Sequence, residues 1–467
     1  MKVHVMNEET KNLVESVPLG LQPAYEIGRA NQPFTLYEGP LTIVSDTARR
    51  QVNGKIEWGW QPSPRIFLST ESIDQDSFND LSSMQTNEVM VEVPNISKAI
   101  PFSIVSNSMK FGSEENASTK LGAIALGPIE HHNSSLLRRV TGHLVNFMEL
   151  LEGRHRFGNS LRMGRAEIRA EGWHLTIDNT EKCRKDIELL KAQGGYAVTH
   201  TIEIRRDDNS LFSVDDTKNL IHALFWFFFL SRGLACPLVL PVGYDIDDQV
   251  VWREWNDLRA DQWKNCRSWL SDRQFVNESL QQALRGFLRC WSNTVWEDSS
   301  TNNAPLRNAI HWFIAANNDA GGVEGCVILS QTALELLSWV LLVEDLQKFG
   351  PNNFDRKKAK EKFDELLQYL GVPNQIPNNL TQLSTMSQLK GWSSGPHALA
   401  EFRNKLVHPS DRNQNANIAF KERYQLLQLA LWYIELTLLH LFGYNGNYMN
   451  RTSTNEWAGV SEPVPWK

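Results

Sequence analysis

The sequence has little cysteine and no long apolar run. Its 5 cysteines among 467 residues include no C-x-x-C pair, so no disulfide framework or zinc ribbon is indicated and a reducing compartment is expected. The longest apolar stretch, Ala223–Leu230, falls far short of the roughly 20 residues that a membrane span needs. We therefore expect a soluble cytoplasmic protein without a membrane partner, in which this stretch is buried within a helix of about residues 215–232.

Several motifs of enzyme chemistry are also missing. The sequence has no G-x-x-x-x-G-K-[ST] or G-x-G-x-x-G phosphate loop and no G-x-S-x-G turn. Glu130, His131, His132 and His143 lie near one another in the chain, but they lack the H-E-x-x-H spacing, and adjacent histidines do not converge easily on one ion. No metal site and no cofactor are expected.

Negative charge is in excess and unevenly distributed. The net charge is −7, which argues against nucleic-acid binding by the whole surface. Residues 301–467 contain 15 Lys+Arg and 15 Asp+Glu, so the entire excess lies in residues 1–300. The C-terminal third is therefore electrostatically different from the rest.

The pattern along the chain predicts a multidomain protein. We expect an N-terminal α+β region with mainly antiparallel strands, followed by an all-α helical bundle. A helix is also expected near 135–152 within the α+β region. The expected divisions are an irregular segment at 1–30, the α+β region at 31–255 in one or two subdomains, a helical connector at 256–300, the bundle at 301–452 and a tail at 453–467.

Helical spacing dominates beyond residue 300. The segments of about 321–347 and 417–443 are apolar nearly all round, which is typical of helices buried by their neighbours. Gly371 is expected to end one helix, and Pro396 is suited to the first turn of another. The expected bundle helices are 305–317, 321–347, 355–370, 396–408 and 417–443.

The fourth of these helices contains the polar text AEFRNKLVHPS, with Arg403, Asn404 and His408. Asn404 and His408 are four residues apart and share a helix face, whereas Arg403 is rotated by about 140° from His408. Pro409 disfavours helical geometry at His408, so the helix should end there. An arginine that binds phosphate and a histidine that moves protons suit phosphodiester chemistry. The alternative is that both residues only cap or solvate the end of the helix.

This pattern, Arg-Asn followed after three residues by His on the penultimate helix of a bundle, resembles the signature of HEPN domains (higher eukaryotes and prokaryotes nucleotide-binding). Glu335 within QTALELL, and the ending LFGYNGNYMNR with Tyr444, Tyr448 and Arg451, agree with subgroups of that superfamily. The resemblance covers roughly residues 300–452. Taken without the resemblance, the two tyrosines and Arg451 are more typical of packing and chain termination than of ligand binding.

The resemblance implies a metal-independent endoribonuclease that cleaves RNA by attack of the 2′-hydroxyl. His408 would act as the general base or acid, Arg403 would bind the scissile phosphate, and Asn404 would orient the histidine or contact phosphate. Glu335 would support Arg403, or would instead be a buried acid paired structurally within the bundle. Two protomers would face each other, which implies a homodimer or higher homo-oligomer.

Other cations are candidates for RNA contact. Arg162, Arg165 and Arg169 form a basic run, and Arg356, Lys357 and Lys358 begin a charged helix, although a solvated or salt-bridged face explains either set. Trp58 and Trp60 alternate on one strand face, which fits an aromatic core better than a pair exposed to stack on bases or a ligand. In a third interpretation, the N-terminal region is itself the active part and binds a carbohydrate or peptide through exposed tryptophans.

The leading hypothesis is a HEPN ribonuclease gated by the N-terminal region, in antiphage defence or a toxin–antitoxin pair. Its partners would be RNA and a phage or host trigger, an antitoxin or another complex partner. The alternative is a non-catalytic HEPN module for dimerisation or RNA binding, joined to an N-terminal ligand-binding domain.

Overall fold

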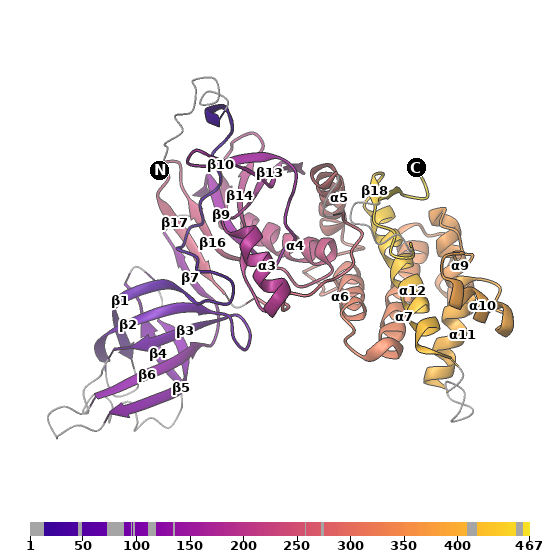
Figure 1. The fold of residues 1–467 in the computed structure, drawn as a ribbon, viewed down its shortest axis with the longest axis horizontal. Coiled ribbons are helices and arrows are strands. Elements are labelled where there is room, and N and C mark those ends of the chain that lie inside the picture. The colour runs from indigo at the N-terminus through magenta and orange to yellow at the C-terminus, as the bar shows by residue number, and fades with distance from the viewer. Residues whose placement is uncertain are drawn as a thin grey trace, which may run out of the picture.

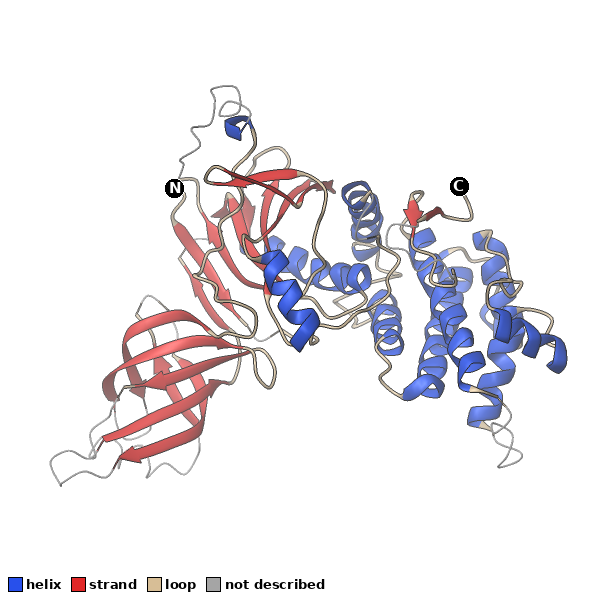
Figure 2. Cartoon of the chain, viewed as in Figure 1, coloured by secondary structure: helices blue, strands red, loops and turns tan. Residues whose placement is uncertain are grey.

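Three parts of the chain lie in a row: a β-barrel, a central β-sheet region and a bundle of helices (Figures 1 and 2). The computed structural model describes residues 14–44, 49–71, 88–94, 96, 99–110, 118–133, 136–256, 258–271, 275–408, 418–453 and 461–467. The expected class, a mainly antiparallel β region followed by a helical region, is confirmed at this level.

The first part is a closed barrel of antiparallel strands in the order β1-β2-β3-β6-β5-β4. The alternating side chains of Ile56, Trp58 and Trp60 are at most 3% exposed, and the Trp60 ring stacks on Tyr196. The barrel core therefore uses this tryptophan pair, and the interpretation of Trp58 and Trp60 as exposed ligand-binding residues is wrong. Its strands are β1 (Phe34–Val44), β2 (Arg49–Gly59), β3 (Arg65–Thr70), β4 (Glu88–Glu92), β5 (Ile100–Lys110) and β6 (Ser118–Ala125).

The second part is a seven-stranded sheet in the order β12-β13-β14-β9-β16-β17-β7, with α3 (Cys183–Gln193) and α4 (Val214–Arg232) packed on it. The apolar stretch of α4 is largely buried, as expected. The sheet strands are β7 (Ile129–His132), β9 (Arg139–Val145), β12 (Arg165–Ala170), β13 (Trp173–Asn179), β14 (Val198–Arg206), β16 (Leu238–Tyr244) and β17 (Val250–Trp255). Two short ladders pair β8 (Leu136–Leu137) with β15 (Phe212–Ser213), and β10 (Arg154–Phe157) with β11 (Ser160–Met163).

Two expectations for helices in the first 300 residues are wrong. Instead of a helix near 135–152, the chain forms the sheet strand β9, where the β-branched residues Val140, Thr141 and Val145 favour an extended backbone. The segment at 256–300, expected to be helical throughout, contains one helix in its described residues, α5 (Val276–Trp291). Residues 258–271 are not helical, and from here on the name connector is kept for this shorter range. They run along the sheet region, where the backbone N–H of Trp263 donates to the Gly195 carbonyl at 2.8 Å.

The third part contains a helix at each of the five expected positions, with three differences. The second helix continues from α7 as the π-helix η1, the third is divided into a short α8 and α9, which begins at Ala359 rather than near 355, and α10 had not been expected. Gly371 ends α9 in the left-handed conformation at φ +66°, and Pro396 lies in the first turn of α11, as expected. The elements are α6 (Pro305–Asn317), α7 (Gly322–Trp339), η1 (Val340–Asp345), α8 (Pro351–Asp355), α9 (Ala359–Leu370), α10 (Thr381–Lys390), α11 (Gly395–Val407), α12 (Phe420–Leu441), β18 (Asn447–Tyr448) and β19 (Glu462–Pro463).

One hydrophobic core runs without interruption from the central sheet through α4 and α5 into the bundle. The core of the barrel belongs to a second cluster, which also includes Val145, Val198 and Val239 of the central sheet. In the described part of the chain, Gly322–Asp345 is the one helix long and apolar enough to cross a membrane, by length and composition alone. It is packed among the other bundle helices and is 67% buried, like the core helix of a soluble protein.

A buried histidine ties the chain before the barrel to the central sheet. The Nε2 atom of His143 accepts a hydrogen bond from the Ala24 backbone N–H at 3.0 Å. Its Nδ1–H therefore faces the carbonyls of Val239 and Leu240, at 3.3 and 3.2 Å, where a bulge in β16 holds Leu240 at φ +51°. Burial lowers the pKa of His143 to about 4, so the residue stays neutral in the folded protein.

We predict that this histidine makes the protein acid-sensitive. The unfolded chain protonates the residue near pH 6.5, before the folded protein does, so stability falls as the pH drops from about 6.5 toward 4. Its contribution to the loss of unfolding free energy between pH 8 and pH 5 is about 2 kcal/mol. His143→Gln keeps a donor and an acceptor but does not titrate, so urea denaturation at the two pH values should show a loss smaller by that amount. His132→Gln, on the exposed side of edge strand β7, should behave as wild type. An unchanged pH dependence in His143→Gln would contradict this explanation.

Candidate functional site

The helix that carries the predicted motif is fixed at its N-terminus and ends where expected. The Ser394 hydroxyl accepts from the His397 backbone N–H at 3.2 Å and caps α11. A side chain at Gly395 would collide with the hydroxyl of Tyr433, so this glycine allows α11 to lie close against α12. At the other end His408 leaves helical geometry, with φ −126° and ψ 69°, and its N–H still donates to the Asn404 carbonyl.

The three motif residues lie at the C-terminal end of α11, with His408 as its cap, and they reach solvent there. Asn404 and His408 are exposed and Arg403 is half-buried. Among the residues that the structure describes, none of their side chains takes part in a hydrogen bond or ion pair. The opposite side of the helix buries Leu399 and Phe402 in the core of the bundle.

The structure adds two residues to the polar face of α11. His397 and Glu401 lie eleven and seven positions before His408, so they share the face of Asn404 and His408. The Nδ1 of His397 accepts from the Ser393 backbone N–H at 3.0 Å, and both added side chains are half-buried. Counting back from His408, steps of four, three and four residues reach Asn404, Glu401 and His397. This helical spacing was the sequence signal for the two added residues, and a search limited to the short motif does not extend to them.

Glu335, the predicted support of Arg403, bonds elsewhere. It is half-buried on α7, and its Oε1 accepts from Nε2 of Gln331, one turn earlier, at 2.9 Å. No ion pair joins Glu335 to Arg403 within the described ranges. In the arrangement seen here, its partner is a residue of its own helix.

The two predicted basic groups differ in the exposure and ion pairing of their side chains. Around the start of α9, Arg356 and Lys358 are exposed, while Lys357 pairs with Glu365 at 3.1 Å. In the central sheet, Arg165 is buried and makes a bidentate ion pair with Asp178 at 2.7 and 2.6 Å. The run is split between strands at Gly164, because Arg162 belongs to β11. Arg165 therefore has a structural role and is not part of an exposed basic surface.

The other two residues of that run remain at the surface. Arg162 is exposed on β11, where every side chain faces solvent. Arg169 on β12 is also exposed and pairs with Asp207 at 2.7 Å. Arg165 and Arg169 are four residues apart on β12 and share a strand face, but burial of Arg165 separates their roles.

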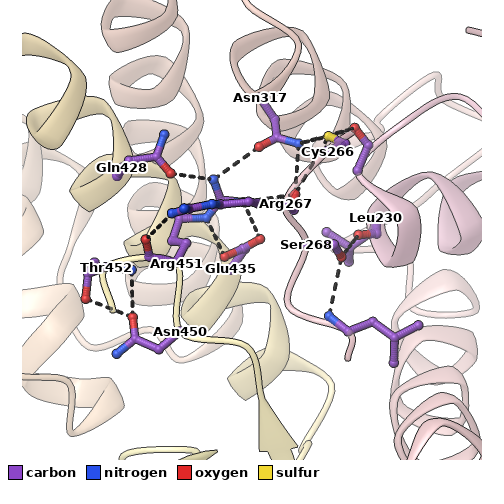
Figure 3. A network of polar contacts seen from close by, with 12 residues as sticks. Leu230, Cys266, Arg267, Ser268, Asn317, Gln428, Glu435, Asn450, Arg451 and Thr452 are labelled. Carbon is purple, nitrogen blue, oxygen red and sulfur yellow. Dashed lines mark hydrogen bonds and ion pairs between the residues drawn. The ribbon is translucent and has the colours of Figure 1, made fainter. Parts of the chain in front are cut away.

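The C-terminal residues form a buried polar network (Figure 3). Arg451 donates to both carboxylate oxygens of Glu435 on α12, at 2.7 and 2.6 Å, and the two side chains are 2% and 0% exposed. Burial raises the pKa of Glu435, and the adjacent guanidinium opposes that shift. Arg451 also donates to Oδ1 of Asn317, at the end of α6, at 3.1 Å. The network thereby joins α6, α12 and the last segment of the chain.

The connector joins the same network. Nη1 of Arg267 donates to the Arg451 carbonyl at 3.1 Å, and the Arg267 carbonyl accepts from Nδ2 of Asn317 at 3.1 Å. The same amide of Asn317 contacts Sγ of Cys266 at 2.7 Å, and burial raises the pKa of that thiol. Two cavities, of about 580 and 390 Å³, flank this junction.

The tyrosines of the ending are packing residues in this structure. The Tyr444 hydroxyl donates to Oγ of Ser279 at 2.9 Å, and the Tyr448 hydroxyl accepts from Nε1 of Trp432 at 2.9 Å. Both rings are fully buried. They hold the end of the chain against α5 and α12.

The glutamate–histidine group of β7 and β9 is dispersed. His143 is committed to Ala24, and Glu130 pairs with Lys218 at 2.7 Å. In the ranges that the structure describes, no group of three or more His, Cys, Asp or Glu residues can hold a metal ion.

These features define a protein with a β-barrel, a β-sheet region and a C-terminal helical bundle. Residues 132–266 match the family described as the YopA central domain, and residues 299–462 match the YopA C-terminal domain. The chain is 27% identical over 442 residues to the "SPbeta prophage-derived uncharacterized protein YopA" of Bacillus subtilis (strain 168), covering 94% of this chain and 96% of that protein. No solved structure matches. The matched ranges follow the sheet region and the bundle, and the barrel lies outside both.

We predict that breaking the buried pair of Arg451 and Glu435 is costly. Glu435→Gln leaves a buried guanidinium without its counter-charge, so the free energy of unfolding should fall by about 3–5 kcal/mol. The matched control is Glu324→Gln, which breaks the partly exposed pair of Glu324 and Arg423 between α7 and α12 and should cost about 1 kcal/mol or less. Chemical denaturation measures both variants. Equal losses of unfolding free energy in the two variants would contradict the explanation that burial makes the Arg451–Glu435 pair costly to break.

Proposed function

We propose that the protein is a metal-independent endoribonuclease of the HEPN type, with its site at the end of α11. The observation that supports this most is the state of Arg403 and His408. Both reach solvent at the C-terminal end of α11, five residues apart, and neither side chain has a partner among the described residues. Arginines with structural roles in this bundle are bound to glutamate, as with Arg307 and Glu297 at 2.6 Å.

The residue types at this helix end suit cleavage of an RNA strand by its own 2′-hydroxyl. The His408 imidazole takes the proton from the 2′-hydroxyl or gives one to the leaving 5′-oxygen, because histidine is the side chain that most often acts as a general acid or base. The Arg403 guanidinium donates to the phosphate oxygens and stabilises the charge that develops there. Asn404 shares the face of His408 and contacts phosphate or orients the imidazole. DNA lacks the 2′-hydroxyl and is therefore inert.

The charge distribution is compatible with this substrate. The excess of seven negative charges lies in residues 1–300, whereas residues 301–467 are balanced. A balanced bundle with local cations such as Arg356 and Lys358 suits transient contact with RNA rather than tight binding. The site would be completed by a second protomer, whose approach is open because the end of α11 faces solvent.

The biological part of the proposal is a growth-arresting nuclease of the cytoplasm, acting in antiphage defence or with an antitoxin. The prophage origin in the name of the relative supports a role in conflict between phage and host. In this proposal the barrel and the sheet region receive the trigger. The continuous core between the sheet and the bundle supplies the mechanical connection.

We predict that purified wild-type protein cleaves labelled RNA in the presence of EDTA, and that Arg403→Ala and His408→Ala each reduce the rate by about 10²–10⁴-fold. Lys405→Ala is the matched control, because it removes a cation from the same turn whose ammonium lies over the Trp392 ring. It should cleave within about threefold of wild type. Circular dichroism verifies that the variants are folded.

Two results would contradict the catalytic proposal. One is cleavage by His408→Ala at the wild-type rate. The other is a wild-type protein that binds RNA but cuts none, tested under every condition in which its expression arrests growth. That result would favour the non-catalytic module instead.

A further inference from the structure

The short ladder of β10 and β11 has one occupied side and one open side. On the side of β10, the backbone N–H of Arg156 donates to the Pro18 carbonyl at 3.0 Å, and the Arg156 carbonyl accepts from the Gly20 N–H at 2.8 Å. On the side of β11, no strand pairs with the ladder in the part of the chain that the structure describes, which runs without a break from 136 to 256. β11 is therefore an edge strand.

The register shows which backbone groups this edge presents. Leu161 lies opposite Arg156, whose N–H and C=O point away from β11 toward residues 18–20. The two residues thus form a non-hydrogen-bonded pair, so the N–H and C=O of Leu161 point to the open side. The N–H of Met163 points the same way, because it lies two residues further on, whereas the Met163 carbonyl accepts from Nδ2 of Asn179 at 3.3 Å. Three backbone groups of β11 can therefore bond to an added strand.

Apolar side chains accompany the open edge. The inner face of the ladder carries His155, which is fully buried and packs edge-on against Phe157. The outer face carries Leu161 and Met163, which are 41% and 48% exposed. Leu19, which bridges to Arg156 on the same face, is 62% exposed. Apolar side chains grouped beside an open strand edge are typical of a surface that another chain covers.

The ladder is also positively charged. Arg154 and Arg162 are exposed and Arg156 is half-buried. The side chain of Arg156 donates to the carbonyls of Val17 and Gly158, at 2.9 and 3.1 Å, neither of which carries a charge. None of the three arginines forms an ion pair with a carboxylate of the described residues. In a protein of net charge −7, such a local reversal favours an acidic partner.

The same charges disfavour a second copy of the chain. In the antiparallel register that uses both Leu161 and Met163, two copies of β11 would place their Arg162 side chains directly opposite each other. Like charges in that position destabilise a strand pair. RNA would satisfy the arginines but would leave the apolar side chains and the backbone groups of β11 without a role. The edge therefore fits an acidic peptide strand better than either.

We propose that β11 binds an extended acidic segment of another protein, which adds to the ladder as a further strand. The residue of that segment opposite Leu161 exchanges hydrogen bonds with its N–H and C=O. The residue opposite Arg162 is acidic, and its two neighbours, which lie on the face of Leu161 and Met163, are apolar. Alternation of apolar and acidic residues is therefore what identifies the partner. The inference does not depend on cleavage of RNA at α11.

Fluorescence anisotropy of labelled peptides with the full chain tests the proposal. The probe is a short peptide of alternating valine and glutamate, which should bind with a Kd below about 1 mM. Two related peptides should each bind at least about tenfold more weakly. One has lysine in place of glutamate. The other has methylated valine nitrogens, which cannot donate to the Leu161 carbonyl.

Two variants locate the probe at β11. Leu161→Pro removes the N–H at the open edge, which takes no part in the ladder with β10, and should weaken binding at least about tenfold. Arg162→Glu should weaken the glutamate peptide similarly and strengthen binding of the lysine peptide. Arg184→Glu is the matched control, because it makes the same substitution at an exposed position of α3, outside the ladder, and should bind as wild type. Thermal unfolding verifies that each variant is folded, and the methylated peptide tests the same hydrogen bonds on the wild-type protein.

Three results would overturn the proposal. Absence of binding of the glutamate peptide at millimolar concentration would leave Arg162 as a guard against aggregation at the edge. Equal binding of the methylated peptide would show that charge alone attracts the probe, without strand addition. Single-stranded RNA that binds more tightly than the peptide, and that is weakened by Arg162→Glu but not by Leu161→Pro, would identify a nucleic-acid surface instead.

Discussion

The ion pair of Arg451 and Glu435 holds together parts of the chain that no strand or helix joins directly. Two charges buried this deeply are tolerated only because each satisfies the other and because further acceptors surround the guanidinium. Glu435 lies on α12, Asn317 ends α6, and Arg267 belongs to the connector. The last residues of the chain thereby fix the bundle against the sheet region, and the geometry of α12 follows from that attachment.

The position of α11 depends on α12 in turn. Gly395 lies against Tyr433, two positions before Glu435 on the same helix. The N-terminus of α11 is therefore set by a buried contact, whereas its C-terminus, with Arg403, Asn404 and His408, faces solvent. A helix that is rigid at one end and presents uncommitted polar groups at the other is suited to positioning chemistry on a flexible substrate.

Much of the bundle could be predicted from the sequence, because its helices have long apolar periodicity and clear end signals such as Gly371 and Pro396. The central β region was harder to predict. Strand β9 has helix-compatible neighbours, and its extended form is decided by pairing with β14 and β16, which are distant in sequence. The closure of the barrel is likewise a long-range property. The short α10 has weak amphipathic character and was missed for that reason.

The same distinction between local and long-range features applies to the candidate site. The motif on α11 is local and could be found from spacing alone. The partners of Arg165 and Arg451 could not, because Asp178 lies on the neighbouring strand β13 and Glu435 sixteen residues away on α12. Tertiary packing decides which arginines are buried in ion pairs and which reach solvent. This difference separates the structural arginines from the candidate catalytic one.

The chemistry of the RNA ends tests the central proposal most directly. Products of wild-type cleavage would be analysed by mass spectrometry, and the same RNA would be tested with a single 2′-deoxy nucleotide at the mapped site. Attack by the 2′-hydroxyl predicts 2′,3′-cyclic phosphate ends and no cleavage at the deoxy position. Ends with a 3′-hydroxyl, or undiminished cleavage of the deoxy substrate, would contradict the proposed mechanism.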